Sequence, residues 1–201
     1  MSVATGGNLR LHFQKDPIAG FFPLLQKGFY VIVNTSNLLD ILCQISGLDA
    51  DQVQGRIQTL FLNGKPVDDM ASTNVHDGDC LALSAAMPGL VGATMRSGGV
   101  LAGFRHSISH RVTGRQSAKN GGILLIKLFN LLIKEMGPRF LQQGILIRAD
   151  ELQALLRSST QIQWNDCSEA ELDSRRIEID TLAAMDWKPD KGLIRLEVTS
   201  G

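Results

Sequence analysis

The sequence has few cysteines, and their positions exclude two kinds of stabilised site. Cys43, Cys80 and Cys167 are the only three. Their odd number argues against a disulfide framework, and their spacing does not match that of a zinc site. We therefore expect three reduced thiols, no metal or cofactor, and a cytoplasmic location.

The sequence also lacks the hydrophobic segments that direct a chain to a membrane. Residues 1–12 do not have the charged-then-apolar pattern of a signal peptide. The longest uncharged run, residues 80–95, is too short and too rich in glycine and proline to span a bilayer. With 44% hydrophobic and 20% charged residues, the composition is typical of a globular protein that buries one sizeable core or two small ones.

Acidic residues are missing from the middle of the chain. Residues 80–134 contain seven lysines and arginines and no aspartate or glutamate. Residues 1–79 carry 5 basic and 8 acidic side chains, a net charge of −3, and residues 135–201 carry 8 and 12, a net charge of −4. The contrast predicts a distinct basic segment between two acidic modules.

The first of these modules, residues 1–89, is predicted from hydrophobic periodicity and turn signals. Residues 9–13 alternate between apolar and polar, as in a half-buried strand, and FYVIV is an apolar run that suits a central strand. Asn-Gly and Asp-Gly pairs mark two turns. The expected elements are a strand at 9–13, a strand at 29–33, a helix that Asn37 and Asp40 cap and Gly47 ends, a strand before Asn63-Gly64, and a strand at 80–84 after Asp77-Gly78.

A second module, residues 123–201, repeats this pattern. Gly28 and Gly78 are 50 residues apart and Gly144 and Gly192 are 48 apart, which indicates a divergent internal duplication. The expected elements are a strand through Phe129 with a short helix to Met136, a strand after Gly144, a helix that Asp150 and Gln153 cap, an alternating strand at 175–182 and a last strand after Gly192. The alternative for residues 123–136 is one amphipathic helix with Lys127, Asn130 and Lys134 on its basic face.

Residues 90–122 form a predicted glycine-rich connector that belongs to neither module. One interpretation is that its cations bind the phosphates of RNA or another anion, with an affinity that falls steeply with salt. The other is that they complement the two acidic modules within the molecule. The basic residues of the connector are Arg96, Arg105, Arg111, Arg115 and Lys119.

Residues 29–92 resemble the ubiquitin-like β-grasp proteins, and especially bacterial sulfur carriers of the molybdopterin synthase small-subunit and thiamine sulfur-carrier types. The matching stretches are FYVIVNTSNLLDIL, LFLNGKPVDD and HDGDCLALSAAMPGLVG, and residues 123–201 resemble the family more faintly. The resemblance implies an α+β fold of tandem β-grasp modules, each with a mixed sheet and one main helix. In that family a C-terminal glycine carboxylate is adenylated and converted to a thiocarboxylate.

The resemblance points to four glycines, Gly92, Gly98, Gly99 and Gly201. The first three are internal, so each has a free carboxylate only if a protease cuts after it. We therefore favour an interpretation in which MPGLVG is an exit loop from the sheet.

No set of residues has the spacing of a catalytic site, and we assign none. His106 and His110 stand four apart but have no third ligand nearby. The sequence therefore favours a non-enzymatic interaction protein that recognises a protein partner, or a second copy of itself. The alternatives are a sulfur carrier with an adenylating enzyme as its partner, and a small module that binds RNA or an anion; we expect no membrane partner.

Overall fold

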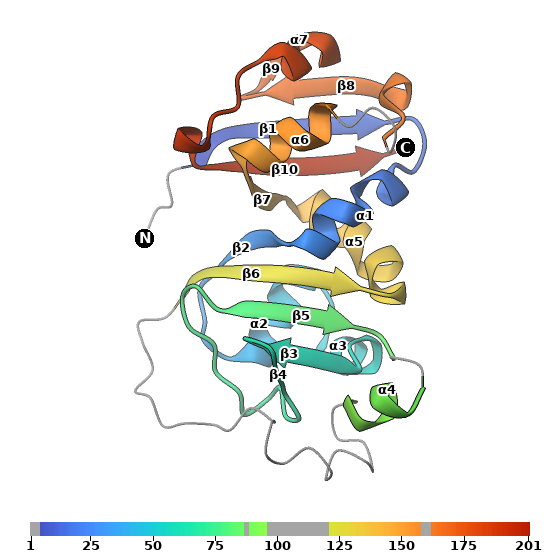
Figure 1. Ribbon diagram of the computed structural model, residues 1–201, viewed down its shortest axis with the longest axis vertical. Helices are drawn as coiled ribbons and strands as arrows, with labels where there is room; N and C mark the ends of the chain where they lie inside the picture. Colours follow the sequence, from blue (N-terminus) through green and yellow to red (C-terminus); the bar gives the residue numbers. More distant parts are fainter. Residues whose placement is uncertain (1–4, 87–88, 96–120, 158–161) are drawn as a thin grey trace. The chain divides into compact units, whose positions relative to one another are not determined.

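The computed structural model of the protein describes residues 5–86, 89–95, 121–157 and 162–201 (Figure 1). Over these residues the chain has an α+β fold with seven α-helices and both parallel and antiparallel strand pairs. It divides into two compact units, a discontinuous unit of Met1–Phe29 with Gly137–Gly201 and a continuous unit of Tyr30–Met136. None of the described helices is long and apolar enough to cross a membrane.

In the continuous unit the strands lie in the order β4-β3-β5-β6-β2. The central strands β5 and β6 are parallel neighbours (Figure 1), and β3 is antiparallel to β5 and to β4. The elements are β2 (Phe29–Val33), α2 (Leu38–Ser46), α3 (Ala50–Arg56), β3 (Thr59–Leu62), β4 (Lys65–Pro66), β5 (Cys80–Ser84), α4 (Gly89–Met95) and β6 (Gly122–Phe129).

Local signals place the first helix and the turns of this unit as the sequence predicts. The Asn37 side chain accepts a hydrogen bond from the backbone N–H of Asp40 (3.1 Å), and Gly47 ends α2 in the left-handed conformation (φ 65°). Asn63 and Gly64 both have positive φ, which is what a tight hairpin turn between β3 and β4 requires. The predicted strands at 29–33 and 80–84 are confirmed with the same bounds.

In the discontinuous unit the strands lie in the order β7-β10-β1-β8-β9. The central strands β1 and β10 are parallel, while β7 and β8 are antiparallel to their central neighbours. The elements are β1 (Thr5–Phe13), α1 (Ile18–Lys27), the later turns of α5 (Leu131–Gln143), β7 (Ile145–Arg148), α6 (Ala149–Arg157), β8 (Cys167–Leu172), β9 (Arg175–Arg176), α7 (Ile179–Ala184) and β10 (Leu193–Ser200).

The core of the discontinuous unit lies on one face of its sheet. Leu9, Leu11 and Phe13 of β1 are at most 1% exposed, and Ile194, Leu196 and Val198 of β10 continue the same layer. The Phe13 ring packs edge-on against Phe21 of α1 (6.2 Å between centroids) and at a tilt against Trp164 (6.1 Å). The alternation that predicts a half-buried strand at residues 9–13 is therefore confirmed.

The second half of the chain departs from the predicted elements in three places. Helix α5 continues past Met136 to Gln143 with Pro138 inside it, because its apolar stripe goes on through Phe140 and Leu141, which are buried. Of the predicted strand at 175–182, only residues 175–176 form a strand, β9, whereas residues 179–182 belong to the helix α7. The antiparallel neighbour of β1 is β8, a strand that the sequence did not predict.

Two further local predictions are wrong. Asp150 lies inside α6 rather than at its cap, and Arg148 precedes the helix, with its N–H donating to Glu151 Oε2 (3.4 Å). The expected exit loop after β5 contains the short helix α4. The strand through Phe129 is confirmed, so residues 123–136 are not one amphipathic helix.

The order of elements along the chain is similar in its two halves. Strand, helix, strand, helix and three strands run from β1 to β5, with α3 as an addition, and again from β6 to β10, with α7 as an addition. Strand β1, which begins the first half, lies in the discontinuous unit, although most of the first half belongs to the continuous unit. Strand β6, which begins the second half, lies in the continuous unit, although most of the second half belongs to the discontinuous unit. The boundaries predicted after residues 89 and 122 stay a prediction, and residues 96–120 lie outside the described part.

Candidate interaction surfaces

The sheet of the continuous unit has an outer face that is largely apolar. Along β3, β5 and β6 the buried residues alternate with half-exposed ones, and the strand register puts Cys80 beside Leu125 and Ala82 between Phe61 and Lys127. A side chain at Gly121, the residue before β6, would meet the carbonyl oxygen of Val33, the last residue of β2. The end of β2 and the start of β6 are therefore neighbours. We call this surface the apolar face; it comprises Tyr30, Ile32, Phe61, Cys80, Ala82, Ile123, Leu125, Lys127 and Phe129.

Exposure of large side chains is concentrated at this face. Ile32 is 46% exposed and Phe129 is 36% exposed, and Leu131, which follows the face at the start of α5, is 63% exposed. These are the only large hydrophobic side chains classed as exposed among the described residues. Ile32 and Phe129 lie on the sheet itself, and exposed apolar side chains on a sheet face are typical of a surface that another molecule covers.

The apolar face is bounded at one end. Thr59 and Ser84 continue the outward-facing row of Phe129, but both are buried. Asn130, with a positive φ of 56°, follows β6 and donates from its side-chain amide to Ser84 Oγ (2.8 Å). The apolar face therefore includes Phe129 on β6 but not its buried neighbours Ser84 and Thr59 in the same row.

Lys127 is the single charged side chain on the apolar face. Strands β2, β3, β5 and β6 contain no aspartate or glutamate, and neither does any residue from 80 to 134. In the described part of the chain no carboxylate lies within ion-pair distance of Lys127. Its neighbours along and across the strands are Leu125, Phe129 and Ala82.

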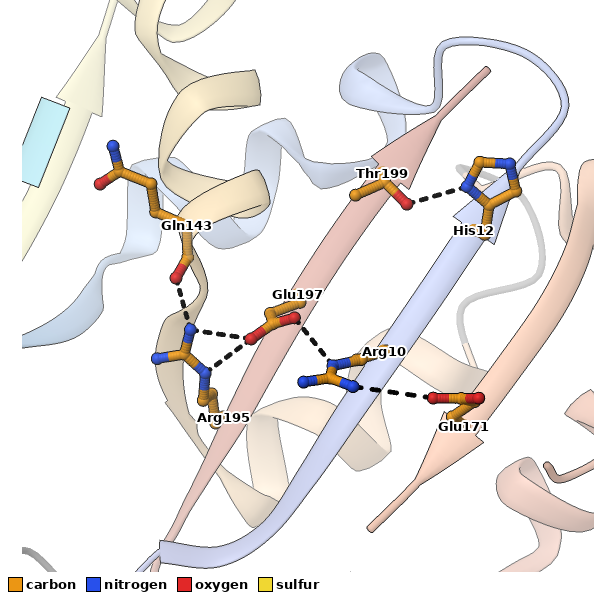
Figure 2. A network of polar contacts seen from close by, with 7 residues as sticks. All are labelled: Arg10, His12, Gln143, Glu171, Arg195, Glu197 and Thr199. Atoms are coloured by element: carbon orange, nitrogen blue, oxygen red, sulfur yellow. Dashed lines mark hydrogen bonds and ion pairs between the residues drawn. The ribbon is translucent and has the colours of Figure 1, made fainter. Parts of the chain in front are cut away.

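The sheet of the discontinuous unit exposes a different kind of surface, shown in Figure 2. Arg10 of β1 lies between Glu197 of β10 (Nε to Oε2, 3.0 Å) and Glu171 of β8 (Nη1 to Oε2, 3.9 Å). Glu197 also accepts a hydrogen bond from Arg195 (2.8 Å). We call this surface the charged face; it comprises Arg10, His12, Glu169, Glu171, Arg195, Glu197 and Thr199.

The strand register explains why these side chains meet. Arg10 is the partner of Glu197 in the parallel β1–β10 ladder and of Glu171 in the antiparallel β1–β8 ladder, so one row of the sheet reads acid, base, acid. In the next row His12 lies beside Thr199, with Nδ1 2.9 Å from the hydroxyl oxygen, and opposite Glu169. Cross-strand pairs of opposite charge stabilise a sheet modestly.

Arg195 also ties the charged face to the end of α5. Its Nη2 donates to the carbonyl oxygen of Gln143 (2.6 Å), as Figure 2 shows, and a side chain at Gly144 would lie 2.5 Å from the same nitrogen. Gly144 has a φ of 88°, which favours glycine on its own account. The guanidinium is therefore held by Glu197 on one side and by the α5 terminus on the other.

A shallow hollow of about 220 Å³ lies over the charged face. One arginine, Arg10, and three glutamates line the hollow; Arg10 pairs with Glu171 and Glu197, and the glutamates outnumber the arginine, so the lining has a net negative charge. No group of three metal-ligating side chains is found among the described residues.

Two of the cysteine thiols, Cys43 and Cys167, have raised pKa values. Burial raises the pKa of the Cys43 thiol, and the negative charges of Asp40 and Asp49 raise it further. Burial also raises the pKa of the Cys167 thiol. Because the thiolate is the reactive form, both cysteines are less nucleophilic than a free thiol at neutral pH.

The residues singled out from the sequence do not come together in one site. Gly92 is buried in α4, and Gly201 follows β10, with its N–H donating to the carbonyl oxygen of Phe13 (3.1 Å). The connector residues Gly98, Gly99, Arg96, Arg105, Arg111, Arg115 and Lys119 lie outside the described residues, as do His106 and His110.

Comparison with known proteins adds no family. No protein-family model, curated protein or solved structure matches the chain. Its function therefore has to be inferred from its own residues. The apolar face was missed by the sequence interpretation, although FYVIV and the acid-free stretch from residue 80 to 134 were signals for it.

Proposed function

We propose that this protein is a non-catalytic interaction protein of the ubiquitin-like β-grasp type, and that it recognises a protein partner through the apolar face. The observation that carries the proposal is the exposure of Ile32 and Phe129 on the same face as half-exposed Phe61 and Leu125. Burial of such side chains stabilises a complex by roughly 25 cal/mol for each Å² of apolar surface removed from water.

The β-grasp part of the proposal is supported by the make-up of each unit. Both contain a mixed sheet with a parallel central pair, a hairpin beside that pair, and a helix that follows a strand directly. A fold of this kind serves many functions, so the choice of function depends on the surface.

The non-catalytic part is supported by the chemistry of the described residues. The two cysteine thiols with shifted pKa values are shifted away from reactivity, and the charged face consists mainly of mutually paired groups. An apolar sheet face with one charge is suited to binding rather than to proton transfer or nucleophilic attack.

A site-specific photo-crosslinking experiment tests the proposal in cells that express the full chain. A photoreactive residue at Phe129 is expected to form a defined adduct with one protein, and the same residue at Glu169, on the charged face, serves as the matched control. The adduct at position 129 should disappear when Ile32→Ser is added. Equal adducts from both positions, or none that depends on Ile32, would show that the apolar face is not the recognition surface.

The intact mass of the protein from the same cells separates the proposal from sulfur carriage. We expect the mass of the unmodified chain. A chain shortened after Gly92 or Gly99, or one in which sulfur replaces an oxygen, would instead favour the glycine-tail chemistry that the family resemblance implies.

A further inference from the structure

Lys127 gives the apolar face a property that exposure alone does not. It lies on β6 beside Ala82 of β5, with Leu125 and Phe129 two residues away along its own strand on the same face. An apolar partner that covers those neighbours also removes water from much of the lysine side chain. The ammonium group loses hydration in the complex unless the partner supplies an acceptor.

The cost of leaving that charge unpaired is large compared with the affinity of an ordinary complex. An ammonium ion taken out of water without a partner costs several kcal/mol, whereas a close, hydrogen-bonded carboxylate offsets much of this loss. Within the continuous unit, the four strands that carry the face have no acidic residue to provide it. No carboxylate of the described residues lies within ion-pair distance of Lys127, so we expect the compensating group to come from the bound molecule.

We propose that the partner presents a protein surface in which one carboxylate, set among apolar side chains, meets Lys127. This inference rests on the proposed function and names the chemistry of the partner at the same face. The carboxylate contributes mainly to selectivity, because apolar surfaces without it leave the ammonium unpaired and are rejected.

Charge disfavours the other occupants. A second copy that docks face to face about a two-fold axis brings one Lys127 towards the other, and like charges repel. Residues 96–120 carry only basic charges, so they repel Lys127 too. A nucleic acid or lipid phosphate surface would find a single cation among apolar side chains, whereas phosphate binding needs several.

The cations of the charged face, on the discontinuous unit, differ from Lys127 in having partners within the molecule. Its arginines are already satisfied: Arg10 has Glu197 and Glu171, and Arg195 has Glu197 and the Gln143 carbonyl. A carboxylate from outside gains little by approaching them. On the apolar face of the continuous unit, by contrast, Lys127 has no ion pair among the described residues.

Selection from a library of random peptides displayed on phage tests the inference with the full chain as the immobilised target. Ligands are first sorted by whether they still bind Ile32→Ser and Phe129→Ser chains. Among ligands that need both side chains, we expect aspartate or glutamate to be enriched on the wild-type chain, and lysine or arginine on a Lys127→Glu chain. Replacing the acidic residue of such a ligand by its amide should weaken binding roughly tenfold to wild type and have little effect with Lys127→Met.

Each outcome bears on one of the two proposals. Ligands that need Ile32 and Phe129 but show no preference for acid, or none that reverses with Lys127→Glu, overturn the carboxylate inference and leave the apolar face as a binding surface. Ligands that bind without Ile32 and Phe129 overturn the proposed function itself. If sedimentation shows a dimer that is lost in Ile32→Ser, the occupant of the apolar face is a second copy of the chain. That result would contradict both the proposed partner and the carboxylate that we infer for it. The variants are compared only where their circular dichroism matches that of the wild type.

Discussion

Each of the two units has a parallel pair of strands at the centre of its sheet, β5 with β6 in the continuous unit and β1 with β10 in the discontinuous unit. The inward-facing residues of these pairs are alike, with leucine, isoleucine, valine and phenylalanine fully or almost fully buried. The outward-facing residues differ. Leu125, Lys127 and Phe129 of β6 belong to the apolar face, whereas Arg10 and His12 of β1 belong to the charged face.

The difference shows which positions the fold dictates and which it leaves open. Residues that alternate inward must be apolar in both units, since they form the core. Residues that alternate outward are not needed for the core, and there the two units have opposite chemistry. On one outer face the arginines pair with glutamates. The other has apolar side chains and a lysine with no ion pair among the described residues, so the recognition surface is expected there.

The order of the central strands is a second difference. In the continuous unit β5, the last strand of its half of the chain, lies next to β3. In the discontinuous unit the equivalent strand β10 lies next to β7, and β1 occupies the place beside β8. Since β1 and β10 are parallel and have the same alternation, either strand presents its apolar residues to the core from either position.

The largest expected effect tests whether the two cores are equivalent. Leu11→Ala in β1 and Ile126→Ala in β6 each remove a side chain that is at most 1% exposed, and each should lower the free energy of unfolding by about 2–5 kcal/mol. Urea unfolding followed by far-ultraviolet circular dichroism measures both variants. Trp164 and Trp187 both belong to the discontinuous unit, so tryptophan fluorescence reports on Leu11→Ala in particular. A cost below about 1 kcal/mol at either position would mean that this unit lacks a close-packed core.

A smaller effect separates the two outer faces. Glu197→Gln removes a charge that pairs with Arg10 and Arg195, so it should lower stability by about 0.5–1 kcal/mol, and by less at high salt because the arginines are well exposed. Lys127→Met in the continuous unit breaks no ion pair, and its stability should stay within about 0.5 kcal/mol of wild type. Chemical unfolding at low and high salt measures both. Similar losses at the two positions would contradict the contrast between the faces.

The smallest effects concern the starts of the equivalent helices α2 and α6. Asn37→Ala should destabilise the protein by about 1 kcal/mol, since it removes the side chain that accepts from the Asp40 N–H. Asp150→Asn should cost less than Asn37→Ala, because Asp150 lies inside α6 and is not its cap. Thermal unfolding of the two variants compares them, and a greater loss for Asp150→Asn would reverse the expected order.

Asp150 adds a pH dependence to this comparison. Hydrogen bonds from Arg148 Nε and Nη2 (both 2.9 Å) hold the pKa of the Asp150 carboxyl below its usual value. A pKa that is lower in the folded state gives stability that is present above the unfolded pKa and is lost as the pH falls through the folded pKa. In an NMR titration, Arg148→Met should raise the pKa of Asp150 towards that of an unpaired carboxyl; an unchanged titration curve would show that the pair does not form in solution.

Local patterns were sufficient for much of the fold. The alternation of Leu9, Leu11 and Phe13, the cap at Asn37 and the turn at Asn63-Gly64 each state a local preference that the fold keeps. The division of the chain into these two units could not be predicted from such local patterns. Nothing in residues 5–13 shows that their parallel partner is at residues 193–200, because the register depends on contacts far apart in the chain.

The elements that were missed are those whose sequence gives a weak or misleading pattern. Strand β8 reads CSEAEL, and only Ala170 among its residues is buried, so it is a strand chiefly because β1 pairs with it. Residues 175–182 alternate like a strand, yet Ile179 and Leu182 are three apart and form one side of the helix α7. The apolar face was missed because a continuous apolar run was interpreted as a strand buried on both sides.

The pairing of β1 with β10 also affects the order in which the two units can fold during synthesis on the ribosome. Arg10 and its partner Glu197 are 187 residues apart, so β1 is synthesised long before the strand it pairs with in parallel. At synthesis rates of about 5–20 residues per second, that interval is on the order of ten to forty seconds. The continuous unit, complete by Met136, can close during this time, while an amphipathic β1 waits without its central neighbour. Strand β1 is thus among the last elements to be protected from aggregation and proteolysis in the newly made protein.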